Sequence, residues 1–247
     1  MGLAQRPLAL TLGDPAGIGP DITLLAYAAR AREDIPPFVL LGDEAVLAAR
    51  ADALGLSVPL ATVTNTNEAA DLFAGALPVL PIEIAGEVVA GRPDLAAMPA
   101  VKQSIEAAVS LVRDGSARAV VTNPISKSLL YQVGFTFPGH TEFLAALAHC
   151  SDADASLLPV MMLAAGPFRV VPVTIHIPLK DVPATLTKEL LLATIRTTDK
   201  DLRRFFGLVR PRLAVTGLNP HAGEDGSLGR EEIDIIAPAI DAARAEG

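Results

Sequence analysis

The sequence predicts an α/β fold with a largely parallel sheet. Short apolar runs rich in Val, Leu and Ile are typical of buried strands, and they occupy residues 8–12, 38–41, 119–122, 160–165, 170–175 and 213–216. Helical patterns lie between several of these runs, at residues 21–32, 43–54, 99–114, 141–150, 187–206 and 231–245. Strands that alternate with helices favour parallel pairing, because each helix carries the chain back to the start of the next strand.

The residues at the helix ends agree with this assignment. Asp114 and Gly115 follow the third helical pattern, where a glycine suits the left-handed conformation that closes a helix. Thr187 precedes the fifth pattern as an expected N-cap, and Gly207 follows its last residue. We therefore expect both helices to begin and end close to these residues.

The size of the chain allows one large core or two modest ones. It has 247 residues, of which 51% are hydrophobic. The stretch 91–99 is rich in turn residues and predicts a domain boundary, with a first α/β lobe at residues 1–97 and a second at 98–247. A surface loop within a single domain is the alternative interpretation of this stretch.

Composition argues against several classes of protein. The net charge is −8 and no run of Lys or Arg stands out, so a nucleic-acid partner is not expected. The apolar runs are much shorter than the roughly 20 residues that a membrane span needs. The single cysteine, Cys150, excludes an internal disulfide and fits a reducing compartment, so we expect a cytoplasmic protein.

Two loops follow predicted strands, at the place where α/β sheets bind ligands. The first, residues 13–20, reads Gly-Asp-Pro-Ala-Gly-Ile-Gly-Pro and opens a helix at Asp21. It matches neither common phosphate-binding glycine motif, and a tight turn that glycine permits explains the same spacing. The second, residues 121–127, places Lys127 in the first turn of a helix. The lysine there suits an anionic ligand, although a solvated surface lysine is more common.

The histidines are the most informative residues. Three of the four lie beside Pro or Gly at breaks in the predicted elements: His140, His176 and His221. Neutral histidine is a common metal ligand, and a catalytic zinc usually takes three protein ligands. His176 and His221 both follow strands and are natural members of such a site, although a single histidine after a strand is more often structural. His149 lies within a helical pattern and is expected to be an ordinary packed residue.

Five segments in order resemble the signature blocks of the 4-hydroxythreonine-4-phosphate dehydrogenase family. They are residues 12–21, 122–127, 137–143, 176–179 and 217–224. The similarity extends from residue 8 to the C-terminal helix. The resemblance implies two α/β/α lobes around a cleft, with a mainly parallel sheet, as in the isocitrate and isopropylmalate dehydrogenases.

The resemblance also implies roles for particular residues. His176 and His221 would bind a divalent metal, with zinc expected first and magnesium or cobalt as alternatives. His140 and Thr141 would contact the substrate. The family implies NAD or NADP as cofactor and a homodimer with its active site at the subunit interface, the second lobe carrying the metal and the dimer surface. No membrane partner is expected.

The implied activity is NAD-dependent oxidation and decarboxylation of 4-hydroxythreonine 4-phosphate, on the way to pyridoxal 5'-phosphate. A dehydrogenase of erythronate or threonate 4-phosphate is one alternative, and an inactive homologue is another. Chains of the family continue past the position of Gly247 and supply a third metal histidine, so we expect this chain to be short at its C-terminus. No general base can be assigned, and Lys127 is a candidate by position only.

Overall fold

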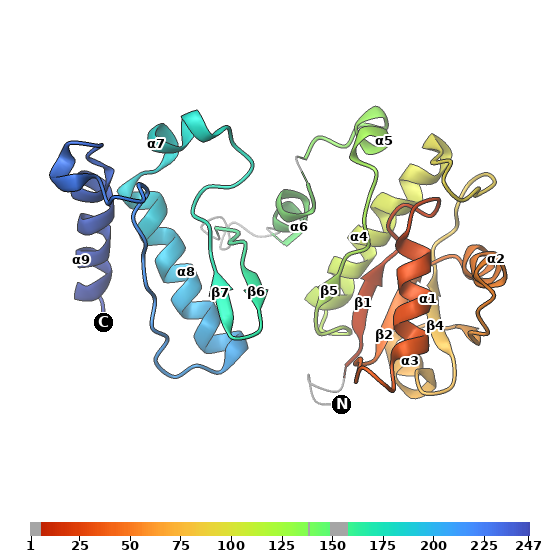
Figure 1. The fold of residues 1–247 in the computed structure, drawn as a ribbon. Coiled ribbons are helices and arrows are strands. Elements are labelled where there is room, and N and C mark those ends of the chain that lie inside the picture. Colours follow the sequence, from red (N-terminus) through yellow and green to blue (C-terminus); the bar gives the residue numbers. More distant parts are fainter. Residues whose placement is uncertain (1–5, 138, 149–157) are drawn as a thin grey trace. The chain divides into compact units, whose positions relative to one another are not determined.

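The computed structural model describes residues 6–137, 139–148 and 158–247. Its contacts form two compact units, unit 1 (Met1–Asp152) and unit 2 (Ala153–Gly247), which are drawn in Figure 1. The predicted α/β class is confirmed. The last two residues of the predicted helix at 141–150, His149 and Cys150, lie outside the described residues.

Unit 1 contains a five-stranded parallel sheet in the order β3-β4-β2-β1-β5 (Figure 1). The strands are β1 (Leu8–Thr11), β2 (Phe38–Gly42), β3 (Leu60–Thr62), β4 (Leu77–Pro81) and β5 (Val120–Val121). The prediction found β1, β2 and β5 and missed β3 and β4. After β1 the chain builds toward one edge of the sheet, and it then returns to add β5 on the other side of β1. Ligands of α/β sheets bind at such a reversal, beyond the carboxyl ends of the strands.

Helices cover both faces of this sheet. The helices of unit 1 are α1 (Gly19–Ala29), α2 (Glu44–Leu54), α3 (Thr66–Leu72), α4 (Met98–Arg113), α5 (Lys127–Gln132) and α6 (His140–Ala148), with a 3-10 turn η2 (Leu95–Ala97) before α4. Helices α5 and α6 pack with α4 and η2 and do not cover the sheet directly. Leu10 and Leu40 face an apolar cluster with α1 and α2, whereas Ala9 and Val39 face a cluster with α4. Because successive strand residues point to opposite faces, these alternating contacts define three layers.

The buried side chain of Ser104 links α4 to the sheet through two hydrogen bonds. The hydroxyl of Ser104 accepts a hydrogen bond from the backbone N–H of Leu12 at 2.8 Å and donates one to the carbonyl of Leu41, also at 2.8 Å. Both backbone groups would otherwise be buried without a partner, since they lie where β1 and β2 end. Ser104 therefore fixes the carboxyl end of the sheet, from which the loops of the candidate site depart.

Unit 2 combines a β-hairpin with helices (Figure 1). Its elements are β6 (Leu163–Ala165), β7 (Phe168–Val170), η4 (Leu179–Asp181), α7 (Val182–Thr185), α8 (Lys188–Phe206), η5 (Glu224–Gly226), a π-helical turn η6 (Glu232–Ile236) and α9 (Ala237–Ala245). The predicted caps are confirmed. The hydroxyl of Thr187 accepts from the N–H of Leu190 at 3.1 Å, and Gly207 closes α8 with φ at 67°.

Three predicted elements of unit 2 differ from the structure. Residues 213–216 form no strand, and the strand predicted at 170–175 covers only Val170. An apolar run predicts burial but does not supply the pairing partner that a strand needs. The helix predicted at 231–245 begins with the π-helical turn and continues as α9, in whose first turn Pro238 lacks the N–H that a regular helix interior requires.

The chain divides into the two units between residues 152 and 153, whereas the sequence predicts a lobe boundary between 97 and 98. The difference arises because α4 packs against β1 and β2 and so belongs to unit 1. The predicted lobes, residues 1–97 and 98–247, are the two lobes that the resemblance to the family implies. This division into lobes stays a prediction. Within the described ranges no helix is long and apolar enough to cross a membrane.

Candidate functional site

The loop after β1 and the loop after β5 interlock at the carboxyl edge of the unit 1 sheet. The side-chain amide of Asn123 donates to the carbonyl of Thr11 and to the hydroxyl of Thr23, both at 2.9 Å. The N–H of Asp14 donates to the carbonyl of Pro124 at 2.8 Å. Asn123 is buried, so these bonds occupy the space between the strand ends. Its role here is structural, because it holds the two loops together.

Gly13 allows the two loops to come this close. Its φ of +69° lies in the left-handed region, and a side-chain carbon there would lie 2.6 Å from Cβ of Asn123 and 2.7 Å from the carbonyl oxygen of Pro124. Both contacts are far inside van der Waals distance, so the glycine is required by space as well as by conformation. Gly13 therefore forms a tight turn that only glycine permits, whereas ligand binding by residues 13–20 stays a prediction.

Arg50 holds the same loop from α2. Its guanidinium donates to the carbonyls of Gly17 at 3.0 Å and Pro15 at 3.2 Å, and it pairs with the carboxylate of Asp21. The arginine is only 9% exposed, and a charged side chain is rarely this buried unless it has partners, which these three contacts supply. Sequence reasoning missed Arg50 because it lies within a helical pattern and shows its role only through contacts distant in sequence.

A second set of polar side chains lies where α5 and α6 begin. Lys127 is the first residue of α5, as the sequence predicts, and His140 is the first residue of α6. The pKa of His140 is lowered, first by burial and second by the positive charge of Lys127. The structure therefore brings Lys127 and His140 together, along with Thr141, in unit 1.

His176 lies in unit 2, in an exposed turn before η4. Its φ is 57°, a left-handed conformation that residues with a side chain adopt rarely. Strained conformations of this kind cluster at functional sites, although they do not identify the function.

His221 lies in a loop of unit 2 that several polar contacts shape. Its N–H donates to the side-chain oxygen of Asn219 at 2.8 Å, and the N–H of Asn219 donates to a carboxylate oxygen of Glu232 at 2.9 Å. The hydrogen bond from the N–H of Asn219 is the main cause of the lowered pKa of Glu232. Ala222 and Glu224 both have positive φ, at 50° and 43°. The loop is thus held in a strained shape around the histidine.

One contact in unit 2 is typical of a metal-binding histidine. Nδ1 of His221 lies 3.1 Å from a carboxylate oxygen of Glu224, the kind of contact that orients a metal-binding imidazole and leaves Nε2 for the ion. No cluster of three or more His, Cys, Asp or Glu side chains suited to a metal occurs among the described residues. The assignment of His176 and His221 as metal ligands therefore stays a prediction, and a catalytic zinc would usually take a third protein ligand.

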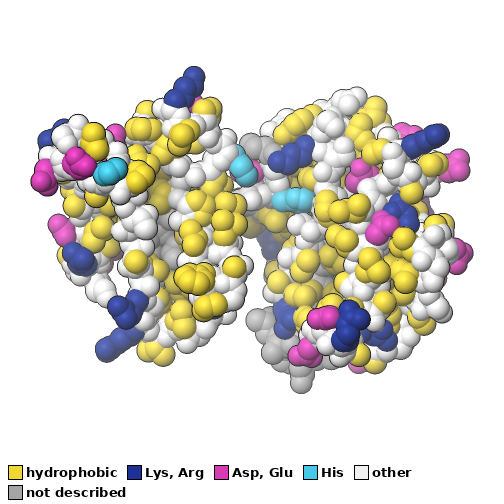
Figure 2. All heavy atoms as spheres, in the orientation of Figure 1, with side chains coloured by type: hydrophobic (Ala, Val, Ile, Leu, Met, Phe, Trp, Pro, Cys, Tyr) yellow, Lys and Arg dark blue, Asp and Glu magenta, His cyan; other side chains and the backbone are white. Residues whose placement is uncertain are grey.

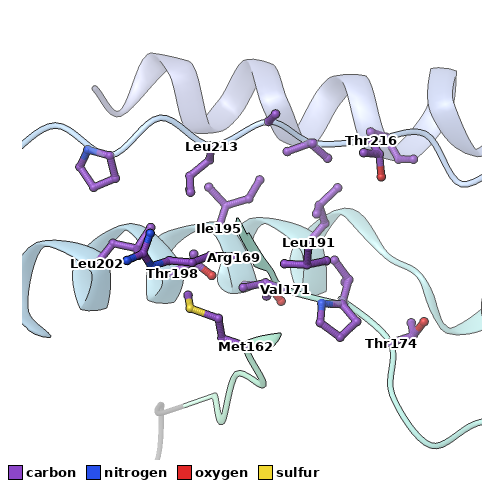
Figure 3. A pocket seen from close by; sticks show the side chains of 18 of the residues that line it. Met162, Arg169, Val171, Thr174, Leu191, Ile195, Thr198, Leu202, Leu213 and Thr216 are labelled. Atoms are coloured by element: carbon purple, nitrogen blue, oxygen red, sulfur yellow. The ribbon is translucent and has the colours of Figure 1, made fainter. Parts of the chain in front are cut away.

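An apolar cavity of about 680 Å³ lies in unit 2 between α8, the hairpin and the segment at 211–218. Figure 3 shows Leu191, Ile195 and Leu213 pointing into it. In the same view residues 171–174 and 213–216 run toward the end of α8 marked by Leu191. His176 and His221 follow these two segments in the sequence, and neither histidine lines the cavity.

The hairpin beside this cavity carries exposed apolar side chains. Figure 2 shows hydrophobic side chains gathered over β6 and β7. Leu163, Phe168 and Val170 are 57%, 73% and 56% exposed. Apolar side chains grouped in this way are more typical of a surface that another part of a protein covers than of one that faces water.

Comparison with known proteins places the chain in a family. The family model of the pyridoxal phosphate biosynthetic protein PdxA matches residues 33–247. The chain is 55% identical to the 4-hydroxythreonine-4-phosphate dehydrogenase of Methylorubrum populi, over 100% of this chain and 71% of that protein. It is 51% identical to the enzyme of the same name from Bradyrhizobium diazoefficiens, over 99% of this chain and 72% of that protein.

Comparison with solved structures supports the same family. The crystal structure of 4-hydroxythreonine-4-phosphate dehydrogenase from Klebsiella pneumoniae matches 98% of this chain and 73% of its own, with a TM-score of 0.82 and 33% identity. A terephthalate 1,2-cis-dihydrodiol dehydrogenase from Burkholderia xenovorans matches 98% of this chain and 71% of its own, with a TM-score of 0.61 and 28% identity. On these similarities of sequence and fold, the chain belongs to the family of the pyridoxal phosphate biosynthetic protein PdxA, whose fold is like that of the isocitrate and isopropylmalate dehydrogenases.

Proposed function

We propose that this chain is a dehydrogenase that oxidises 4-hydroxythreonine 4-phosphate with NAD in pyridoxal phosphate biosynthesis. The observation that carries the proposal is the 55% identity, across the whole chain, to an enzyme of that name. The proposal includes a homodimer with its active site at the subunit interface, in the cytoplasm, and it leaves NADP as an alternative to NAD.

His140 and Thr141 are proposed to hold the substrate. Both residues lie at the start of α6, beside Lys127 and near the carboxyl edge of the sheet. Hydrogen bonds from such side chains fix the orientation of a small substrate, which lowers the entropic part of the reaction barrier. Bound NAD would supply the hydride acceptor for oxidation of the secondary alcohol to a ketone, and the resulting β-keto acid would lose carbon dioxide.

His176 and His221 are proposed to hold a divalent metal, zinc first, with the Glu224 carboxylate orienting the His221 imidazole. When bound, such an ion acts as a Lewis acid toward the hydroxyl of the substrate and toward the ketone that follows. Support comes from the left-handed backbone of His176, from the same conformation at Ala222 and Glu224 beside His221, and from the contact of His221 with Glu224.

The activity is tested by NADH formation from purified protein with zinc, NAD and 4-hydroxythreonine 4-phosphate. We expect turnover with this substrate at a kcat/KM at least tenfold above that for erythronate 4-phosphate or threonate 4-phosphate. The same assay with NADP separates the cofactors. Higher kcat/KM with either four-carbon acid would reassign the substrate, and no NADH from any of the three would contradict the dehydrogenase.

Replacing His221 with alanine is expected to weaken zinc binding by tenfold or more, because a ligand atom is lost. Zinc affinity is measured by competition with a chromophoric chelator. Glu224→Gln should produce a smaller loss, since it removes only the orienting contact, and His140→Gln should leave the affinity unchanged. Equal zinc affinity in His221→Ala and the parent protein would remove His221 from the metal site.

A further inference from the structure

Lys127 and His140 lie next to a backbone position that carries no side chain. A side-chain carbon at Gly139 would lie 3.4 Å from Nζ of Lys127 and 3.4 Å from Oε2 of Glu142. The ammonium group of Lys127 and the carboxylate of Glu142 therefore both lie close to the backbone of Gly139, just before α6. Any larger residue at position 139 would occupy the space into which they extend.

His140 has a buried nitrogen that needs a partner. Its Nε2 atom is buried and has no hydrogen-bond partner within the described parts of the chain. A buried polar atom without a partner lowers stability, and such atoms in native proteins call for a functional explanation. Because burial and the Lys127 charge lower the pKa of His140, its imidazole is neutral at pH 7, and one ring nitrogen is then a hydrogen-bond donor.

The position of the group in the fold also suits a ligand. Lys127 begins α5 directly after the loop that follows β5, on the side of β1 where the strand order reverses. The Lys127 side chain is exposed, so a solute can reach its ammonium group and the flexible stem can move to admit it. Oε2 of Glu142 comes as close to the built position at Gly139 as Nζ of Lys127 does, so the group carries both charges.

We propose that Lys127 binds the phosphate group of the substrate, and that neutral His140 donates a hydrogen bond to the same phosphate from Nε2. This inference rests on the proposed function and adds Lys127 to its substrate-binding residues. The ammonium group of Lys127 attracts the negative phosphate, and the His140 imidazole orients it through a hydrogen bond. A phosphate oxygen then accepts the hydrogen bond for which Nε2 has no partner. A lysine that only pairs with Glu142 on the surface is the competing explanation.

The probe is inorganic phosphate, titrated into the intact chain while the histidine ring signals are followed by NMR. The chain has four histidines, so the His140 signal is identified by its loss in His140→Gln. We expect phosphate to shift this signal in the parent protein. In Lys127→Gln the phosphate Kd should rise roughly tenfold, as expected for loss of one charge-assisted hydrogen bond, and Lys127→Arg should retain most of the affinity.

Lys102→Gln is the matched control. Lys102 lies on α4 in the same unit and pairs with Glu106 at 3.1 Å, and the lowered pKa of His140 has Lys127 and not Lys102 among its causes. Its phosphate affinity should equal that of the parent. The pKa of His140 should rise in Lys127→Gln and stay unchanged in Lys102→Gln, because only Lys127 repels the protonated imidazole.

Three results would overturn the phosphate subsite: no phosphate-dependent shift of the His140 signal, equal affinity in Lys127→Gln and the parent, or an equal loss in Lys102→Gln. NADH formation measured on the same samples separates this inference from the proposed function. Lys127-dependent phosphate binding without NADH formation would support the subsite and contradict the dehydrogenase. NADH formation with an unchanged KM in Lys127→Gln would support the dehydrogenase and contradict the phosphate subsite.

Discussion

Replacing Gly13 with alanine is expected to lower the free energy of unfolding of unit 1 by about 3 kcal/mol. Two effects add. The φ of +69° is unfavourable for any residue with a side chain, and the new methyl group would meet Cβ of Asn123 and the carbonyl of Pro124. The second neighbour is backbone and cannot rotate away. We therefore expect the loops after β1 and β5 to separate, with loss of the Asp14 to Pro124 hydrogen bond.

Tyrosine fluorescence during urea unfolding measures this effect. The chain has no tryptophan and two tyrosines, and both lie in unit 1, Tyr27 in α1 and Tyr131 in α5. Gly55→Ala is the matched control, because Gly55 has a φ of +65° but nothing within 4 Å of the added carbon. It should lower stability by about 1 kcal/mol, from conformation alone. Equal losses in the two variants would mean that the contact with Asn123 is unimportant.

The elements that the sequence predicts well are those with uninterrupted apolar runs. Strands β1 and β2 are buried over nearly their whole length, so their composition alone indicates them. Strand β4 pairs with two neighbours but contains Pro78 and Pro81, residues that normally argue against a strand. Strand β3 is three residues long and partly exposed, too short for a periodic pattern.

In the candidate site, features that depend on neighbouring residues could be predicted from the sequence, whereas contacts between distant residues could not. Lys127 was found because a strand precedes it and a helix begins at it, and both features are local in sequence. The contacts of Asn123 with Thr11 and of Arg50 with Pro15 join residues that are 112 and 35 positions apart. No periodicity or spacing in one sequence records such pairs, so their structural roles required coordinates.

Replacing Arg50 with methionine is expected to lower the stability of unit 1 by about 2 to 3 kcal/mol. Methionine fills a similar volume but leaves the carbonyls of Pro15 and Gly17 without their donor. The loss is smaller than for a fully buried ion pair, since the side chain of Asp21 is 25% exposed and water compensates part of its charge. The same fluorescence experiment measures the change, with Arg32→Met as the control.

Arg32 pairs with Glu33 at 2.8 Å, and both side chains are more than half exposed. Its replacement should change stability by less than about 0.5 kcal/mol, as is usual for exposed ion pairs. Because Arg50 fixes the loop beside the proposed substrate site, Arg50→Met should also raise KM for the substrate at temperatures where unit 1 stays folded. A variant as unstable as predicted but with parental KM would show that the loop is a structural support and does not touch the substrate.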